Sequence, residues 1–411
     1  MDTTGIHFID EFNLKEEMTV LVRVDFNVPL SDGEVSDDTR IRAALPTIEH
    51  VIESGAKLIL CSHLGRPKGT RDPKLSLEPV AARLAEIIDT DTLLYDMEVV
   101  FPENILGTDV DTLLTELNPN RQIMLLENLR FHPGEKAGDD EFAKELAELA
   151  DVYINDAFGA THRKHASVYT INKYFDRNHR GAGFLIKSEL EGLGKLLNRT
   201  ETPYVAIVGG AKVSDKLGVL KSLLDRVDTI LIGGAMAYTF LAAKGVSVGD
   251  SLVEHDYIEE ARSILDRTRV QNTDIILPDD HCTGTSLEAT EARITPDATI
   301  PDGQMGLDIG PQTRERFKQI IASAATVFWN GPLGVFENPA FADGTLAIAH
   351  AVAEAKAYSV IGGGDSAAAV ARAGVAEAID HVSTGGGASL QLVEGNPLPG
   401  IESLRPNHPF D

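Results

Sequence analysis

The chain has 411 residues, of which 43% are hydrophobic and 24% are charged, as in a globular protein of two or three domains with sizeable cores. Its formal net charge is −26, from 37 basic and 63 acidic residues, so nucleic acids and anionic membranes are not expected as partners. The N-terminal residues lack a secretory signal and no apolar run reaches the length of a membrane helix, which predicts a cytoplasmic protein.

Two further features of the composition bear on the environment. Cys61 and Cys282 are the two cysteines, and they lie too far apart in sequence to form a metal or redox motif. They are expected to be reduced thiols in a reducing compartment. An acidic surface with few basic residues suits high salt, where counter-ions screen its self-repulsion. A halophilic source is therefore a hypothesis.

Apolar, β-branched segments alternate with amphipathic helical patterns along the chain, which predicts an α/β fold with parallel sheets covered on both faces. The first half is predicted to contain strands and helices in the order 20–26, 57–62, helix 76–88, 122–128, helix 141–151 and 151–157. The segment 179–199 is expected to be a connecting helix, with Gly181 and Gly183 as candidate hinge positions. The second half is predicted as strand 204–210, helix 214–226, strands 228–234, 274–278 and 325–331, helix 344–357, and strands 357–364 and 381–387.

In the first half, basic and polar side chains follow the predicted strands. Ligands of open α/β sheets bind at the carboxyl ends of the strands, and the planar fork of arginine matches phosphate and carboxylate oxygens. Each arginine taken alone more often serves a structural ion pair with a neighbouring acid. Together they indicate a small ligand with two or three negative charges. The residues are Arg23, Asp25, Asn27, Arg40, His63, Arg66, Arg130, His162, Arg163 and His165.

In the second half, glycines follow the strands instead. Glycine lets the backbone approach a phosphate closely, and the next helix directs its N–H groups there. The stretch "GGAKVSDK" adds Lys212 and Lys216, and a helix starting near Val213 or Ser214 would place Lys216 in its first turn. It is not a P-loop, because Gly-Lys-Ser/Thr is absent. Asp365 opens another predicted helix, where it could cap the helix or hold Mg²⁺ on nucleotide phosphates, and tight loop packing remains the alternative for the glycines.

Nine motifs then occur in one order along the chain: "RVDFNVP", "SHLGRPKG", "LLENLRFH", "NDAFGATHRKH", "GGAKVSDK", "LDIGPQT", "WNGPLGVFE", "GGGDS" and "STGGGASL". On these motifs the chain resembles phosphoglycerate kinase over essentially its whole length. The resemblance implies two doubly wound, Rossmann-like parallel-sheet domains joined by a helical hinge. The expected division is an N-terminal substrate domain at 1–178, a hinge helix and nucleotide domain at 179–390, and a tail at 391–411 that packs back on the first domain.

The resemblance also assigns roles residue by residue. Arg40 and Lys212 are implied to be catalytic, flanking the phosphoryl group in transfer, and Asp365 is the implied ligand of Mg²⁺. The implied 3-phosphoglycerate site comprises Asp25, Phe26, Asn27, Arg40, His63, Leu64, Gly65, Arg66, Arg130 and Arg163. The implied ATP or ADP site comprises Lys216, Glu337, Gly363, Gly364, Asp365 and Ser366.

The implied reaction moves a phosphoryl group reversibly between 1,3-bisphosphoglycerate and ADP on one side and 3-phosphoglycerate and ATP on the other, in glycolysis and gluconeogenesis. The acceptor carboxylate is already ionised at neutral pH, since carboxyl pKa values lie around 4, so no general base is required. Positioning and charge neutralisation are expected to carry an in-line transfer. We expect the two domains to close when both substrates bind, and the family resemblance suggests a monomer.

Two other functions compete with this hypothesis. A nicotinamide-dependent dehydrogenase would carry a G-x-G-x-x-G turn in its first βαβ unit, and the first half has none. A non-catalytic anion- or nucleotide-binding module would leave unexplained why one half is basic and the other glycine-rich.

Overall fold

The computed structural model describes residues 3–92, 97–198 and 201–410. The chain divides into two compact units. We call Asp2–Glu191 with Pro397–Asp411 the N-terminal unit, and Gly192–Asn396 the C-terminal unit. Among the described residues, no helix combines the length and apolar character that a membrane crossing needs.

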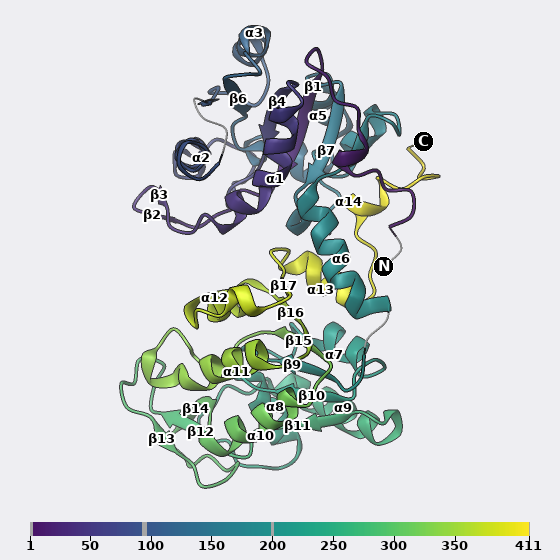
Figure 1. Cartoon of the computed structure of the whole chain (residues 1–411). Coiled ribbons are helices and arrows are strands. Elements are labelled where there is room, and N and C mark those ends of the chain that lie inside the picture. Colours follow the sequence, from purple (N-terminus) through teal and green to yellow (C-terminus); the bar gives the residue numbers. More distant parts are fainter. Residues whose placement is uncertain (1–2, 93–96, 199–200, 411) are drawn as a thin grey trace. The chain divides into compact units, whose positions relative to one another are not determined.

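The N-terminal unit is built on a six-stranded sheet in the order β5-β6-β4-β1-β7-β8, in which every neighbouring pair is parallel (Figure 1). Its strands are β1 (Thr19–Val24), β4 (Lys57–Cys61), β5 (Glu98–Val100), β6 (Gln122–Leu125), β7 (Val152–Asp156) and β8 (Arg180–Ala182). Its helices are α1 (Thr39–Glu53), α2 (Glu78–Asp91), α3 (Thr108–Glu116), α4 (Pro133–Ala137), α5 (Asp140–Ala147) and α14 (Pro399–Glu402).

Alternate residues of this sheet enter two separate cores. Val20, Val22 and Val24 of β1 pack with α1 and α2, whereas Leu21 packs with α3 and α5 on the opposite face. Because side chains of a strand alternate between its faces, helices on both sides require a strand that is apolar at every position. From Val20 to Val24, β1 meets this requirement except at Arg23, which is fully buried.

The C-terminal unit has a second six-stranded parallel sheet, in the order β11-β10-β9-β15-β16-β17. Its strands are β9 (Tyr204–Val208), β10 (Thr229–Ile232), β11 (Asp274–Ile276), β15 (Thr326–Asn330), β16 (Tyr358–Gly362) and β17 (His381–Val382). Its helices are α7 (Leu217–Leu223), α8 (Met236–Ala243), α9 (Ile258–Gln271), α10 (Pro311–Ala322), α11 (Asp343–Glu354), α12 (Gly364–Arg372) and α13 (Gly387–Val393).

The core of the C-terminal unit is centred on β9 and β15. Ile207 and Trp329 pack against α10, α11 and α12, while the alternating residues Ala206 and Phe328 are equally buried on the other face. Strand order reverses between these two central strands, since β10 and β11 follow β9 on one side and β16 and β17 follow β15 on the other. Such a reversal is where open α/β sheets bind ligands.

Several short elements were not predicted. A three-stranded antiparallel sheet is formed by β12 (His281–Gly284), β13 (Arg293–Ile294) and β14 (Met305–Ile309). A hairpin of β2 (Leu30–Ser31) and β3 (Glu34–Val35) turns through Asp32 and Gly33, both with positive φ, which is the geometry of an Asp-Gly hairpin turn. These strands are mostly too short for a periodic pattern to stand out in the sequence.

The segment 179–199 was predicted to be one connecting helix, and the structure shows a helix over only part of it. It begins with strand β8, which pairs in parallel with β7, and the helix α6 (Phe184–Asn198) follows. A Cβ atom at Gly183 would lie 2.3 Å from the Asp156 carboxyl carbon, and one at Gly181 would lie 2.6 Å from the His7 carbonyl oxygen. Close packing therefore accounts for both glycines, and the boundary between the units falls inside α6, between Glu191 and Gly192.

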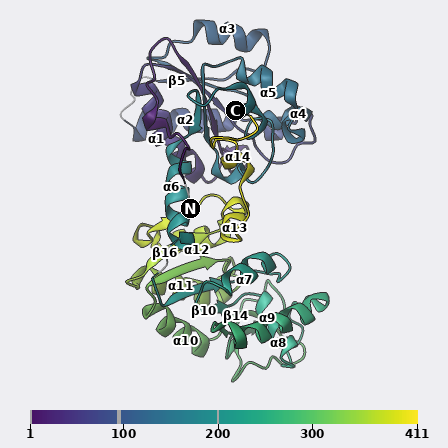
Figure 2. The same ribbon diagram turned by 90° about the vertical axis from the view of Figure 1, so that its right-hand side faces the viewer.

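The C-terminal segment belongs to the N-terminal unit (Figure 2). The Gly400 N–H donates to the Thr161 carbonyl over 2.8 Å, and the Asn172 side chain donates to the Ser403 hydroxyl over 2.9 Å. A Cβ atom at Gly400 would lie 3.0 Å from the Thr161 Cα atom. The last residues of the chain thus hold the loop that follows β7.

Candidate active site

Four loops of the N-terminal unit bring the predicted basic residues to one edge of the sheet. Asp25 follows β1, His63 follows β4, Arg130 lies after β6 in the short helix Leu129–Phe131, and Arg163 lies in the loop after β7. Because these strands are parallel and adjacent, their carboxyl ends lie at the same edge. The cationic groups of these loops influence one another. In addition to burial, the charges of Arg130 and Arg40 help to lower the pKa of His63, and the charge of Arg163 helps to lower the pKa of Arg130.

Asp25, Asn27 and Arg40 form the first part of this cluster. The Arg40 guanidinium, from the first turn of α1, donates to the Asp25 carboxylate over 3.1 Å and to the Asn27 carbonyl over 3.3 Å. The Asn27 side-chain oxygen accepts the Gly65 N–H over 2.8 Å, which holds the loop after β4 against the loop after β1. One Asp25 oxygen, Oδ1, is buried without a hydrogen-bond partner.

Arg66, Arg130 and Arg163 have guanidinium N–H groups without a hydrogen-bond partner among the described residues. Arg130 is 5% exposed, donates from Nη1 to the Gly65 carbonyl over 2.6 Å, and its Nε has no partner. Arg163 donates from Nε to the His162 ring over 3.0 Å, and Arg66 is exposed. In the ranges that the structure describes, no carboxylate pairs with Arg66, Arg130 or Arg163. Of these three arginines and Arg40, the alternative of neutralisation by a local acid therefore applies only to Arg40.

The electrostatics keep the histidines of the cluster neutral. Burial, followed by the charge of Arg23, holds the pKa of His63 well below its usual range. Burial and then Arg130 lower the pKa of His165 to about 3, and burial with Arg163 lowers that of His162. Burial and the neighbouring Arg23 lower the pKa of Arg130 to about 10, which still leaves it charged at neutral pH. The positive charge of the cluster is therefore carried by arginines.

Phe26, Leu64 and Gly65 play different parts from the charged residues. The Phe26 and Leu64 side chains are 0% and 2% exposed and belong to the core. The Phe26 N–H and carbonyl are already bonded to Ser62 and Val28. Gly65 has a φ of +62°, and a Cβ atom there would lie 2.6 Å from Leu75, so this turn requires glycine.

The glycines of the C-terminal unit divide into two groups. At the reversal point, a Cβ atom at Gly331 would lie 2.1 Å from the Gly209 carbonyl oxygen, and one at Gly234 would lie 2.6 Å from the Gly210 nitrogen. These glycines serve close packing between loops, the alternative left open by the sequence. Gly364 faces open space instead, so its backbone is accessible to a ligand.

Lys216 lies at this reversal point, but it does not lie in a helix turn. The helix α7 begins at Leu217, three residues later than the latest predicted start, and Lys216 precedes it. The reason is that the Ser214 N–H and hydroxyl are both held by the Glu254 carboxylate, at 3.0 and 2.6 Å, which fixes a turn in place of a first helical turn. Burial lowers the pKa of Lys216. The exposed Lys212 lies in the same loop.

Asn330 is the polar residue that connects the parts of this site; the motif "WNGPLGVFE" predicted its presence in this region without a specific role. Its side-chain oxygen accepts from the Lys216 ammonium, and its amide donates to the Gly362 carbonyl over 2.6 Å. A Cβ atom at Gly363 would lie 2.9 Å from the same amide nitrogen. Asn330 is 1% exposed at the end of β15, so its position at the end of a central strand was the available signal.

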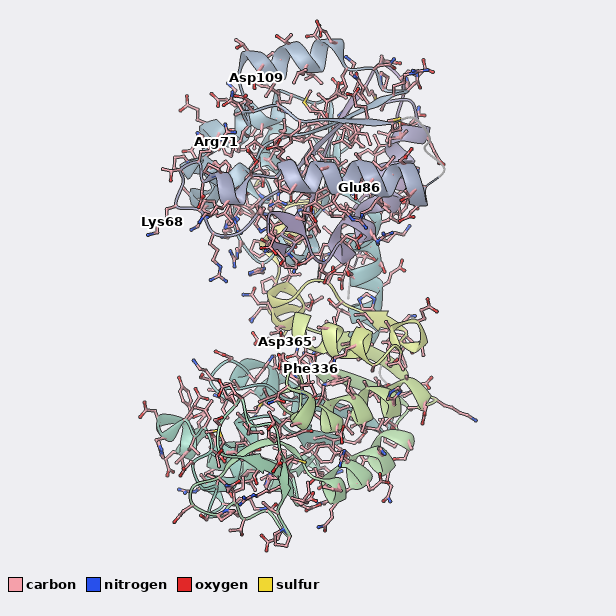
Figure 3. The ribbon with its side chains drawn as sticks, turned by 90° about the vertical axis from the view of Figure 1, so that its left-hand side faces the viewer. Lys68, Arg71, Glu86, Asp109, Phe336 and Asp365 are labelled. Atoms are coloured by element: carbon pink, nitrogen blue, oxygen red, sulfur yellow. The ribbon has the colours of Figure 1, made fainter. Side chains whose placement is uncertain are left out.

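The remaining residues of the predicted nucleotide site lie around α12. Asp365 is exposed in the first turn of this helix (Figure 3), and Glu337 is exposed in the loop after β15. Ser366 is fully buried, and its hydroxyl accepts the Gly331 N–H over 2.6 Å, so it joins α12 to the loop after β15. Within the described ranges no group of three His, Cys, Asp or Glu side chains is arranged to hold a metal ion. A single accessible carboxylate suits Mg²⁺ that is bound chiefly by nucleotide phosphates.

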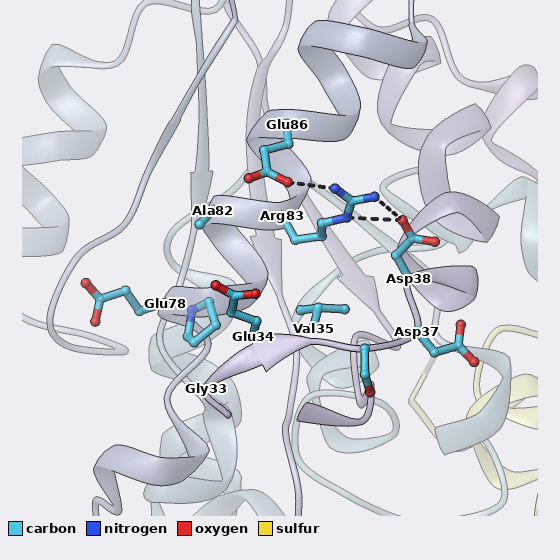
Figure 4. Close-up of a pocket in the computed structure, with 11 residues that line it drawn as sticks. Gly33, Glu34, Val35, Asp37, Asp38, Glu78, Ala82, Arg83 and Glu86 are labelled. Atoms are coloured by element: carbon cyan, nitrogen blue, oxygen red, sulfur yellow. Dashed lines mark hydrogen bonds and ion pairs between the residues drawn. The ribbon is translucent and has the colours of Figure 1, made fainter. Parts of the chain in front are cut away.

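A pocket of about 750 Å³ in the N-terminal unit contains none of the predicted site residues (Figure 4). It lies between β3 and α2 and is lined by Glu34, Glu78 and Glu86 among others. Arg83 is its one cationic lining residue and is paired with Asp38 and Glu86, at 2.7 and 2.6 Å. An acidic lining repels anions, so this pocket is not a site for a phosphorylated acid.

Comparison with known proteins identifies the family. Residues 9–396 match the family model described as phosphoglycerate kinase. The phosphoglycerate kinase of Anaeromyxobacter sp. (strain K) is 53% identical over 388 residues, covering 93% of this chain and 96% of that protein. The phosphoglycerate kinase of Prosthecochloris aestuarii is 51% identical over 390 residues, covering 94% and 96%.

Solved structures agree in fold over the whole chain. Phosphoglycerate kinase from Coxiella burnetii has a TM-score of 0.83 and 37% identity, covering 97% of this chain and 98% of that one. The enzyme from Pyrococcus horikoshii OT3 has a TM-score of 0.84 and 32% identity with the same coverage. The predicted α/β fold with two doubly wound parallel sheets is confirmed, whereas the hypothesis of a halophilic source gains no support from these relatives. The chain belongs to the phosphoglycerate kinase family and has the activity of that family, a glycolytic phosphoryl transfer with a carboxyl group as acceptor.

Proposed function

We propose that the arginine-rich edge of the N-terminal unit binds 3-phosphoglycerate or 1,3-bisphosphoglycerate, and that the glycine-rich edge of the C-terminal unit binds ATP or ADP with Mg²⁺. The observation that carries the proposal is the state of Arg66, Arg130 and Arg163. No carboxylate within the described residues neutralises them, although acids outnumber bases 63 to 37 in the chain. Unpaired guanidinium groups at strand ends favour a phosphorylated ligand.

The two ends of the phosphorylated acid have different partners in this proposal. Arg66, Arg130 and Arg163 hold the phosphate, because their free donors suit its oxygens. Asp25, Asn27 and His63 lie toward the hydroxyl and carboxylate end. Asp25 Oδ1 is buried without a donor, and a substrate hydroxyl would supply one.

For the nucleotide, accessible backbone and charge are the supporting features. Gly363 is the N-cap of α12, and Gly364 is the first residue of this helix and has open space around it. Asp365 would hold Mg²⁺ together with the nucleotide phosphates, and Mg²⁺ would neutralise charge on the transferring phosphoryl group. Lys216 is the cation for the phosphate chain, Ser366 fixes the start of α12, and Glu337 would accept hydrogen bonds from the ribose hydroxyls.

The chemistry requires positioning more than proton transfer. The acceptor is a carboxylate that is ionised at neutral pH, so Arg40 and Lys212 act as charge stabilisers for in-line transfer. Direct transfer requires the reacting atoms to be about 3–3.5 Å apart, so we propose that the units close when both substrates are bound. Small-angle scattering should then show compaction only with both ligands present. A monomeric, cytoplasmic enzyme is the proposed form.

The roles of Arg40 and Lys212 can be tested with matched controls. Arg40→Ala and Lys212→Ala are each expected to lower kcat by about 100-fold, a typical loss for one charge stabiliser. Arg42→Ala removes a neighbouring arginine of α1 that is paired with Asp38 and Asp91, and kcat should stay near the original value. Activity is measured with 3-phosphoglycerate and Mg-ATP, and losses below tenfold in both Arg40→Ala and Lys212→Ala would contradict these roles.

A further inference from the structure

A buried chain of hydrogen bonds runs from Glu135 through Ser167 to Arg23 behind the arginine-rich edge, and neither Glu135 nor Ser167 had an expected role. The Arg23 Nε–H donates to the Ser167 hydroxyl over 2.9 Å. The Ser167 hydroxyl and N–H both donate to the Glu135 carboxylate, over 2.7 and 3.0 Å. Arg23, Ser167 and Glu135 are each 0% exposed. The serine hydroxyl accepts a hydrogen bond from the guanidinium, which can only donate, and it donates its own proton to the carboxylate.

Ser167 has little freedom to rearrange. Its carbonyl accepts the Tyr153 hydroxyl over 2.6 Å, so its N–H, carbonyl and hydroxyl all have partners within the core. Glu135 lies in α4, which begins with His132 as N-cap and Pro133. A fully buried arginine is tolerated when its charge is compensated and its donors are satisfied. Glu135 compensates the charge through the serine, and the three guanidinium nitrogens of Arg23 are bonded to Ser167, the Val24 carbonyl and His63.

At its other end, Arg23 sets the state of a site residue. Arg23 Nη2 lies 2.9 Å from His63 Nδ1, and a guanidinium can only donate. His63 Nδ1 is therefore the acceptor and carries no proton. In a neutral imidazole the proton then lies on Nε2, which leaves Nε2–H as the one ring donor of His63.

We propose that Glu135 and Ser167 are positioning residues that act through Arg23 to hold His63 as a neutral imidazole with its proton on Nε2, ready to donate to the bound anion. This inference rests on the proposed anion site. It differs from electrostatic attraction by a charged histidine, since a neutral donor keeps the same hydrogen bond across the physiological pH range. It also gives Glu135, a residue without exposed surface, an effect on substrate binding.

The charged surroundings of His63 agree with this assignment. Arg23, Arg130, His165 and Arg40 all disfavour a charged ring, and with burial they keep the pKa of His63 well below its usual range. Asp25 is the acid that faces the ring, with 3.9 Å between its Oδ1 and His63 Nδ1. The distance from His63 Nδ1 to Arg23 Nη2 is shorter, at 2.9 Å. The Arg23 guanidinium, and not the Asp25 carboxylate, is therefore the hydrogen-bond partner of His63 Nδ1.

The tautomer can be measured directly on the ligand-free full chain. Long-range ¹H–¹⁵N correlation spectra resolve protonated and unprotonated ring nitrogens, and the signal of His63 among the 12 histidines is assigned by its loss in His63→Gln. We expect Nδ1 unprotonated and Nε2 protonated from pH 6 to 8. In Glu135→Gln and Ser167→Ala, the two nitrogens should become averaged or titrate in this range. The Michaelis constant for 3-phosphoglycerate should rise about 10-fold or more, the effect of losing one hydrogen bond to a charged group.

The control is Glu127→Gln. Glu127 is also buried in the N-terminal unit, and it accepts a serine hydroxyl and a backbone N–H, from Ser76 and Leu77, over 2.8 and 2.9 Å. Glu127→Gln should lower the free energy of unfolding and leave the His63 nitrogen signals unchanged. If Glu135→Gln does not fold, Ser167→Ala decides the matter.

A protonated Nδ1 in the original protein would overturn the proposal, as would unchanged His63 signals in both variants. Because the tautomer is read without substrate, failure of the proposed anion site would appear separately, as an unchanged Michaelis constant together with the expected nitrogen signals.

Discussion

Asp156 offers a prediction whose magnitude follows from the structure. It ends β7, is 0% exposed, and its Oδ1 accepts the Ile186 N–H over 3.1 Å at the start of α6. Its Oδ2 is buried without a partner. Burial, opposed by a hydrogen bond from Thr47, raises the pKa of Asp156 from 3.8 to about 7. The change to test is Asp156→Asn, which keeps the shape and the acceptor but cannot ionise.

The sign and size follow from proton linkage. Between pH 4 and pH 7 the folded chain keeps a proton on Asp156 that the unfolded chain has lost. The free energy of unfolding therefore falls as the pH rises through this range, up to the folded pKa of about 7. Each unit of pKa difference corresponds to about 1.4 kcal/mol. Between pH 5 and pH 8, Asp156 should therefore remove about 3 kcal/mol from the free energy of unfolding of the original protein. Asp156→Asn should not show this loss.

Comparing the variant with the original protein cancels the contributions that other titrating groups make to the free energy of unfolding. The pKa of His165 is lowered to about 3 and that of His281 to about 4, both chiefly by burial, so these residues act in the opposite direction as pH rises through the usual histidine range. They act equally in both proteins and cancel in the difference. Rearrangement of the Thr47 hydroxyl around an amide also costs free energy, but equally at both pH values.

Urea unfolding followed by far-UV circular dichroism at pH 5 and pH 8 provides the measurement. Trp329, the single tryptophan, lies in the core of the C-terminal unit, so its fluorescence follows that unit separately. Asp308 in the C-terminal unit has its pKa raised to about 7 by burial, and Asp308→Asn is the matched variant. If Asp156→Asn and the original protein lose the same free energy between pH 5 and pH 8, Asp156 is not the group that titrates.

Four further predictions concern two glycines, an arginine and salt. Gly331→Ala should destabilise the C-terminal unit by at least about 3 kcal/mol, because φ is +98° and the new Cβ would lie 2.1 Å from a carbonyl oxygen; urea unfolding by Trp329 fluorescence measures this. Gly364→Ala has open space, so stability should hold while the Michaelis constant for Mg-ATP rises about 10-fold, or about 1.4 kcal/mol; an unchanged constant would remove Gly364 from the nucleotide site. Arg66→Ala should raise the Michaelis constant for 3-phosphoglycerate about 10-fold or more, with Lys68→Ala, an exposed cation on the same loop, near the original value. With a net charge of −26, the urea midpoint should rise with KCl into the molar range, and a falling midpoint would reject the halophilic hypothesis.

The central strands could be predicted from sequence because both faces of each sheet are covered. Strands such as 204–208 and 326–330 are buried at every position, which produces continuous apolar runs, and the predicted ends exceeded the observed ones by the glycines that follow. The edge strand 98–100 and the strand 180–182 have three residues each, too few to show a period. The start of α7 depended on Glu254, forty residues away in sequence, and no local pattern could reveal that.

The charged groups of the site were foreseeable, and their support was not. Arginines and lysines at strand ends contrast with an acidic chain, so composition alone draws attention to them. The sequence predicted no role for Glu135 or Ser167. Their role depends on Arg23, an arginine inside an apolar strand, which was expected near the ligand and is instead fully buried behind His63.

The return of the C-terminal segment to the N-terminal unit has a consequence for biosynthesis. The Gly400 N–H completes the loop at Thr161, yet it leaves the ribosome only after all of Gly192–Asn396 has been made. At about 5–20 residues per second, a nascent chain waits on the order of 10–40 s with that loop uncapped. Translation that stops before Pro397 therefore yields a product whose arginine-bearing loop lacks its final support, even though every residue of the proposed substrate and nucleotide sites is already present.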